Sequence, residues 1–170
     1  MSQIKPEAVT AIIEGMKESG IDLVTSLSTH MINPLINAID DDPALNHVPV
    51  ANEGDCIGIC LGAWLGGKTP AFVAQNSGMV LATYHLMDSI SFFGGTPLVM
   101  LIDQSGAFGT RHPPHFYYYA LLGPKILELL QIPYTTVDKI EKIKNEIDNA
   151  VETARGMGKP ACVFLAGELY

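Results

Sequence analysis

Apolar and polar positions along the chain follow two alternating periods. Apolar residues at every third or fourth position predict an amphipathic helix over residues 6–18, which ends at Gly20. Short apolar runs, of which 97–102 is the most apolar, separate the helical segments. Strands are therefore predicted at 21–25, 47–51, 70–75, 97–102, 133–137 and 161–165. Further helices are predicted at about 28–39, with Ser28 or Thr29 as its cap, and at 53–65, 78–91, 115–130 and 138–157.

This alternation predicts an α/β protein of three layers. Strands that alternate with helices and are apolar throughout are typical of a doubly wound, mainly parallel sheet with helices on both faces, here of six strands. The chain has 170 residues without internal repeats or linkers, so residues 1–170 are expected to form a single domain. Such a sheet binds ligands at the carboxyl ends of its strands, which selects the loops 26–31, 51–55, 75–79 and 103–115.

Composition narrows the class of partner. The formal net charge of −8 argues against nucleic acid and anionic membrane surfaces, which bind clustered cations. No apolar segment approaches the ~20 residues that span a bilayer, and the N-terminus lacks a leader pattern. Three cysteines without a C-x-x-C pair indicate reduced thiols in a cytoplasmic protein. A chain that is 48% hydrophobic and 16% charged fits a subunit with a large buried interface, so we expect an oligomer.

Cys60 lies in Gly58-Ile59-Cys60-Leu61-Gly62, which looks like the nucleophile turn of class I glutamine amidotransferases. Such a turn must directly follow a strand, whereas the residues before Cys60 predict a helix. The late His-x-Glu pair of that family is also missing, because the last histidine is His115. A glutaminase that uses Cys60 is therefore the third hypothesis, and a buried core cysteine is the favoured interpretation.

Phosphate and metal motifs are also weak. Lys68 belongs to a Gly-Lys-Thr sequence that lacks the remaining glycine of a phosphate-binding loop. His112 and His115 are three residues apart, but two prolines between them preclude a helical face, and no acidic residue or cysteine is close in sequence. No metal ligand is predicted in this chain.

Asn52-Glu53 is a stronger candidate. It places a carboxylate in the first turn of a Gly/Ala-rich helix, directly after a predicted strand. Spacing alone favours an ordinary acidic helix start that is stabilised by the helix dipole. The surrounding sequence changes this interpretation.

The segment Val50-Ala51-Asn52-Glu53, the glycines that follow it and Pro70-Ala71-Phe72-Val73-Ala74-Gln75-Asn76-Ser77-Gly78 resemble the pyrimidine-binding domain of thiamine diphosphate enzymes. Among these enzymes the chain is most similar to the sulfopyruvate and phosphonopyruvate decarboxylase group. The resemblance covers most of the chain and is densest from Asn52 to Gly78. It implies the pyrimidine-domain type of α/β fold.

The resemblance implies a role for Glu53. In the family, the matching glutamate hydrogen-bonds N1′ of the aminopyrimidine and so drives formation of the reactive ylid. Asn52 and the turn Gln75-Asn76-Ser77-Gly78 would line the cofactor. The resemblance also implies substrate contacts from the loops after the first and fourth strands, for which the candidates are Thr29, His30, Arg111 and His115.

The family motif for the diphosphate, Gly-Asp-Gly with a later Asn, is absent from this sequence. The resemblance therefore implies that the diphosphate and Mg²⁺ are bound mainly by a separate beta subunit, in a dimer or larger hetero-oligomer. The expected function is that of the alpha subunit of a thiamine diphosphate-dependent decarboxylase acting on a small 2-oxo acid. Two departures lie where substrate should bind. The Gly-Leu-Gly-Asn of close relatives becomes Gly78-Met79-Val80-Leu81, and their charged Arg-Gly loop becomes Asp103-Gln104-Ser105-Gly106-Ala107-Phe108-Gly109. A non-catalytic assembly or regulatory homologue is therefore the alternative.

Overall fold

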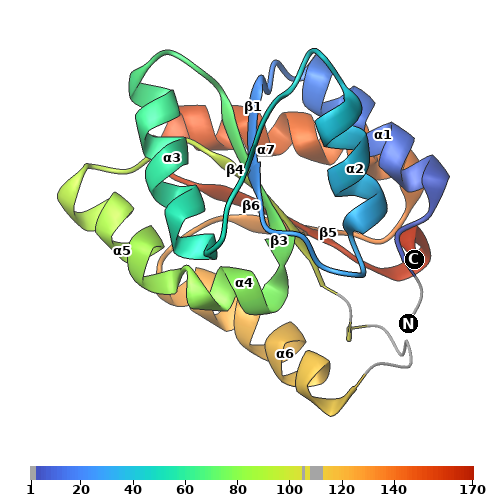
Figure 1. Ribbon diagram of the computed structural model, residues 1–170. Helices are drawn as coiled ribbons and strands as arrows, with labels where there is room; N and C mark the ends of the chain where they lie inside the picture. The colour runs from blue at the N-terminus through green and yellow to red at the C-terminus, as the bar shows by residue number, and fades with distance from the viewer. Residues whose placement is uncertain (1–2, 105, 108–112) are drawn as a thin grey trace.

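The computed structural model describes residues 3–104, 106–107 and 113–170 (Figure 1). The strands are β1 (Leu23–Ser26), β2 (Asn46–Pro49), β3 (Pro70–Gln75), β4 (Val99–Asp103), β5 (Tyr134–Val137) and β6 (Ala161–Leu165). The helices are α1 (Pro6–Glu18), α2 (Asn33–Asp41), α3 (Glu53–Leu65), α4 (Asn76–Leu81), α5 (Thr83–Phe92), α6 (Pro114–Leu129) and α7 (Ile143–Met157). Two short 3-10 helices are η1 (Ile140–Lys142) and η2 (Gly167–Leu169).

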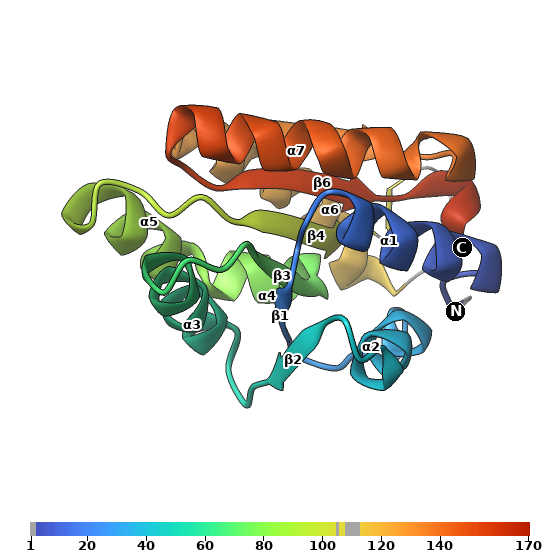
Figure 2. The same ribbon diagram turned by 90° about the horizontal axis from the view of Figure 1, so that it is seen from above.

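The strands form one parallel sheet in the order β2-β1-β3-β4-β6-β5. Helices α1, α2 and α7 cover one face, and α3 to α6 cover the other (Figures 1 and 2). A hydrophobic core lies between the sheet and each helical layer. Strand β4 is buried throughout, and its side chains alternate between the two cores: Leu101 belongs to the core under α1, α2 and α7, and Met100 to the core under α3 to α6. The predicted three-layer α/β fold is confirmed.

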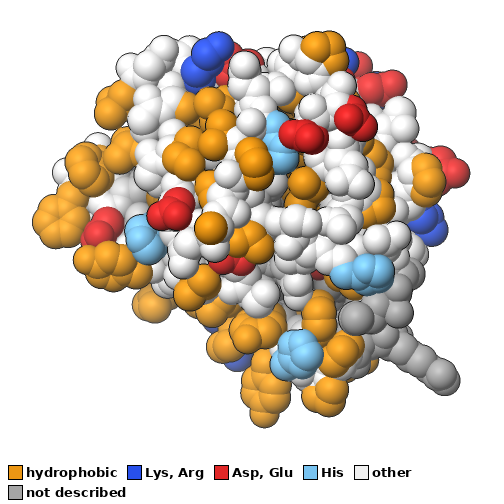
Figure 3. All heavy atoms as spheres, viewed as in Figure 1, with side chains coloured by type: hydrophobic (Ala, Val, Ile, Leu, Met, Phe, Trp, Pro, Cys, Tyr) orange, Lys and Arg blue, Asp and Glu red, His pale blue; other side chains and the backbone are white. Residues whose placement is uncertain are grey.

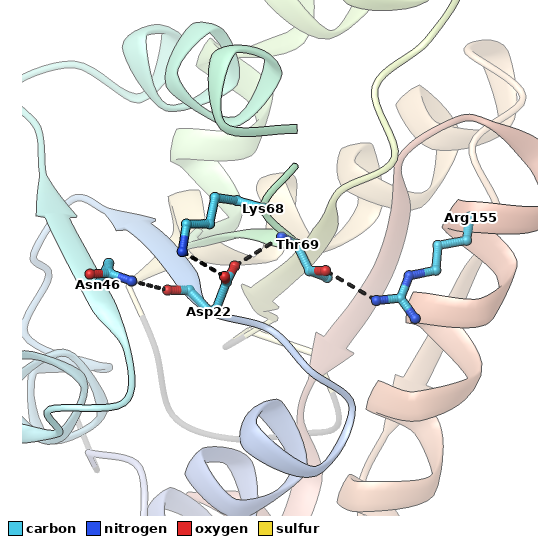
Figure 4. Close-up of polar contacts among 5 residues, drawn as sticks. All are labelled: Asp22, Asn46, Lys68, Thr69 and Arg155. Atoms are coloured by element: carbon cyan, nitrogen blue, oxygen red, sulfur yellow. Dashed lines mark hydrogen bonds and ion pairs between the residues drawn. The ribbon is translucent and has the colours of Figure 1, made fainter. Parts of the chain in front are cut away.

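Polar contacts tie the amino ends of the strands together (Figure 4). The Asp22 carboxylate accepts a 2.9 Å hydrogen bond from the Thr69 backbone N–H and pairs with Lys68 at 3.0 Å. The Asp22 carbonyl accepts from the Asn46 side chain at 2.7 Å, and Arg155 of α7 donates to the Thr69 hydroxyl at 3.0 Å. Lys68 is thus an ion-pair partner at the edge of the sheet opposite to the candidate loops.

Several helix boundaries differ from the sequence prediction. Helix α2 begins at Asn33 rather than near residue 28, and its cap is Ile32 without a side-chain bond. Pro34 fixes this start, while the Ser28 hydroxyl hydrogen-bonds the Asn33 side chain, so neither Ser28 nor Thr29 caps the helix. The helix predicted at 78–91 is divided into α4 and α5, which meet at Ala82.

Helices α1 and α3 have the predicted bounds. The segment predicted as one helix from 138 begins with η1, and α7 follows from Ile143. In the described part of the chain, no helix combines the length and apolar content needed to cross a bilayer.

We expect Asp22→Ala to lower the free energy of unfolding by about 1–2 kcal/mol, because it removes acceptors for a backbone N–H and a lysine. Urea denaturation measures this change. The control is Asp148→Ala, which alters an exposed acid on α7 and should change stability by less than about 0.5 kcal/mol. Equal stability of the two variants would contradict a stabilising role for the Asp22 contacts.

Candidate functional site

The carboxyl ends of β2 and β3 bring Glu53 and Gly78 into contact. Asn52 has extended backbone, and its side chain accepts a 2.8 Å hydrogen bond from the Gly54 N–H, so α3 begins at Glu53. A Cβ placed on Gly78 would lie 2.5 Å from Glu53 Oε1 and 2.7 Å from its Cγ. The Glu53 side chain therefore lies directly on the backbone of α4, and a larger residue at position 78 would require it to move.

A histidine that the sequence analysis did not select lies beside this contact. A Cβ on Gly54 would be 2.3 Å from Cε1 of His85, so the imidazole of α5 packs on the first turn of α3. Tyr84 meets the same ring edge-on at a centroid distance of 5.5 Å. No sequence motif includes His85. Its position against Gly54, next to Glu53, follows only from the packing of α5 on α3.

Buried polar atoms without hydrogen-bond partners gather at the same edge of the sheet. Within the described residues they include Thr29 Oγ1 after β1, both amide atoms of Asn76 after β3 and Gln104 Oε1 after β4. Asn76 is 1% exposed, and its amide faces Gly123 of α6. Because buried polar groups are normally paired, atoms of this kind at one edge indicate a site for a polar ligand or water.

The other predicted site residues are distributed along this edge. Gln75 and Ser77 are half-buried, and Gln75 pairs in register with Asp103 of β4. His30 is exposed, and its carbonyl accepts a 2.9 Å bond from the Gln3 side chain. His115 is exposed in the first turn of α6, where its ring packs on Phe116 at 4.7 Å. Neither histidine lies in the Glu53–Gly78 contact, and Arg111 and His112 lie outside the described residues.

Asp103 is a fully buried acid that the sequence analysis assigned only to a loop. Burial, followed by the charge and hydrogen bonding of Asp103, raises the pKa of Tyr170 well above its usual value. The sequence analysis assigned Asp103 to a loop because an acidic residue at the end of an apolar strand is usually exposed. Its burial depends on the packing of the C-terminal residues over β4.

Cys60 does not have the features of a nucleophile. It lies within α3, is buried, and its Sγ is 3.4 Å from Thr25 Oγ1. Burial raises the pKa of the Cys60 thiol to about 12 and that of Cys56 to about 11. These thiols are protonated at neutral pH, which argues against the glutaminase hypothesis. Among the residues with described positions, no three His, Cys, Asp or Glu side chains form a metal-binding group.

We expect Gly78→Ala to cost about 1–3 kcal/mol of stability, because the new methyl group overlaps the Glu53 side chain. In a Glu53→Ala background the same change should cost much less, and a double-mutant cycle in urea measures the difference. The control is Gly156→Ala in α7, where a Cβ meets nothing within 4 Å and alanine should stabilise the helix. Additive effects of Glu53→Ala and Gly78→Ala would contradict the contact.

Comparisons with known proteins agree with the resemblance found in the sequence. The sulfopyruvate decarboxylase subunit alpha of Methanothermobacter thermautotrophicus is 28% identical over 162 residues, which are 95% of this chain and 97% of the relative. That of Methanococcus maripaludis is 29% identical and covers 93% of both chains. The phosphonopyruvate decarboxylase of Streptomyces viridochromogenes is 26% identical over 74% of this chain, but over 32% of its own length. No protein-family model matches the chain.

Proposed function

We propose that this chain is the alpha subunit of a thiamine diphosphate-dependent decarboxylase that acts on a small 2-oxo acid. The observation that carries the proposal is the Glu53 carboxylate, held at the start of α3 against Gly78 at the carboxyl edge of the sheet. The similarity to two sulfopyruvate decarboxylase alpha subunits extends over nearly the whole chain, and it supports a carboxy-lyase rather than a hydrolase.

The residues at this edge fit the aminopyrimidine part of the cofactor. Glu53 offers a carboxylate, and the missing side chain of Gly78 leaves the space in which that carboxylate lies against α4. Asn76 holds buried donor and acceptor atoms without partners. We assign Asn52, Glu53, Gln75, Asn76, Ser77 and Gly78 to cofactor binding, and Thr29, His30, Arg111 and His115 to the substrate.

Each group has a defined chemical task. A carboxylate favours the protonated form of a ring nitrogen with which it shares a hydrogen bond, so Glu53 would hold a proton at N1′ of the pyrimidine. The Asn52 cap fixes the first turn of α3 and thereby the direction of the Glu53 side chain. When bound, the cofactor supplies the electron sink into which the carbon–carboxylate bond is cleaved.

The outer surface of the layer formed by α3 to α6 has features of a protein–protein interface. Gly58 and Gly62 on the outer side of α3 have open space where a Cβ would stand, so a neighbouring helix can approach closely. Apolar side chains gather over α4, α5 and α6 (Figure 3). The large exposed apolar residues of this layer are Leu65, Leu81, Tyr84, Met87, Phe92, Tyr117, Tyr118, Leu121, Leu122 and Leu129, with Phe93 just beyond α5.

We name these eleven residues the apolar face and propose that they bind the beta subunit. That subunit would carry the diphosphate and Mg²⁺, since this sequence lacks the motif for them. The free cysteines Cys56, Cys60 and Cys162 agree with a location in the cytoplasm, where thiols stay reduced.

Glu53→Gln in the complex with the diphosphate-domain chain should lower decarboxylation about 100-fold or more, because the amide cannot hold a proton as the carboxylate does. Release of CO₂ from a panel of 2-oxo acids measures turnover, and calorimetry measures binding of thiamine diphosphate with Mg²⁺. Gly156→Ala is the control. A wild-type complex that binds no cofactor and decarboxylates nothing would favour the non-catalytic homologue.

Phe93→Glu and Leu121→Glu should weaken association with the beta subunit about tenfold or more, because each places a charge in the apolar face. Met157→Glu is the matched control, since Met157 is a half-exposed apolar residue on α7 in the opposite layer. Calorimetric titration gives the Kd of each variant. If Met157→Glu weakened association as strongly, the assignment of the interface to α3–α6 would be wrong.

A further inference from the structure

A pocket opens between α3 and α5, one helical turn from Glu53. The two helices touch where the His85 ring lies on the backbone of Gly54. One turn further along α3, a Cβ on Gly58 would meet nothing within 4 Å, so the space beside this glycine is open. The pocket has a volume of about 150 Å³ and is lined by Ile57, Gly58, Leu61, His85, Asp88, Ser89 and Phe93.

The lining of this pocket combines apolar surface with ionisable groups. Ile57 is 2% exposed and belongs to the core under α3 to α6, whereas Phe93 is 63% exposed. Asp88 is half-buried and contributes a carboxylate, and His85 is exposed and contributes an imidazole. A group that enters from solvent therefore meets both an apolar wall and a carboxylate.

The helices around the pocket carry negative charge alone. Every residue of α3, α4 and α5 is described, and these helices contain Glu53, Asp55 and Asp88 but no lysine or arginine. Within the described residues, none of these three carboxylates forms an ion pair. Acidic side chains accordingly lie among the apolar ones over this layer (Figure 3). A partner of opposite charge is favoured here, and one of like charge is repelled.

A lysine or arginine side chain fits both parts of the lining. Its methylene groups pack on apolar surface such as Ile57 and Leu61, while its charged end reaches Asp88. A second copy of this chain fits less well. A symmetric contact through this layer would bring the three acids of each copy together, and neither copy offers a lysine or arginine from these helices.

We propose that this pocket, the α3–α5 pocket, anchors the beta subunit by taking a lysine or arginine side chain from it. The inference rests on the proposed function, which supplies the partner. Phe93 belongs both to the lining and to the apolar face, so the pocket continues the surface assigned to that subunit. The apolar face then provides buried area, and the pairing with Asp88 fixes where the partner sits on it.

Asp88→Asn tests the charge, because it removes the carboxylate and keeps the shape of the side chain. In the complex with the diphosphate-domain chain it should raise the Kd about five- to tenfold. The Kd of the wild type should also rise more steeply with ionic strength than that of the variant. Asp55→Asn is the matched control and should change the Kd less than about twofold, since Asp55 is an exposed acid of α3 outside the lining.

Gly58→Leu tests the space, because the new side chain occupies the pocket. It should raise the Kd about tenfold or more without lowering Tm, since leucine favours a helix over glycine and a Cβ here meets nothing within 4 Å. Gly156→Leu is the control, at an equally open position on α7 in the opposite layer. Calorimetric titration gives each Kd, and thermal melting shows that each variant folds.

The outcomes separate this anchor from the proposed function. Wild-type Kd values for Asp88→Asn and Gly58→Leu, in a complex that decarboxylates a 2-oxo acid, would overturn the anchor and leave the function standing. The expected Kd changes, in a complex that binds no thiamine diphosphate, would support the anchor and overturn the function. A loss for Asp55→Asn as large as that for Asp88→Asn would overturn the anchor in favour of general charge attraction. A dimer of the isolated chain that Gly58→Leu dissociates, read by sedimentation, would assign the pocket to a second copy instead.

Discussion

The candidate site depends on the close approach of the Glu53 side chain to the backbone of Gly78. This approach requires a parallel sheet, because only parallel strands end at the same edge, and it requires β2 and β3 to lie on either side of β1. It also requires a glycine at position 78, where any side chain would overlap the carboxylate. The side of the Glu53 carboxylate that packs on Gly78 is shielded from water, and its other side is available to a ligand.

The two edges of the sheet use charge differently. At the amino edge, Asp22 pairs with Lys68 and accepts hydrogen bonds from Thr69 and Asn46, which joins β1, β2 and β3. Arg155 of α7 donates to the Thr69 hydroxyl. The carboxyl edge holds Glu53, the buried Asp103 and, among the described residues, several neutral polar atoms without hydrogen-bond partners. One edge therefore contributes stability, while the other retains unsatisfied hydrogen-bonding capacity, which is what a binding site requires.

Local patterns in the sequence predicted the parts of this structure that local interactions determine. The bounds of α3 followed from a Gly-rich apolar run. The role of Glu53 stays a prediction, which rests on the family resemblance and not on local spacing. The start of α2 was missed because Pro34 and the Ser28–Asn33 bond outweigh capping preference. His85 and Asp103 could not be found in this way, since each acquires its surroundings from elements distant in sequence.

The two helical layers also differ in what they leave exposed. Helices α1 and α7 pair their surface charges, as in the contacts of Lys144 with Glu14 and Glu18. The layer of α3 to α6 instead presents the apolar face and helix α3, in which Gly58 and Gly62 meet open space. Burial of such a surface releases water from apolar groups, and the missing side chains of Gly58 and Gly62 let two backbones pack closely. Because α3 also begins with Glu53, a chain that covered this face as we propose would lie beside the candidate site.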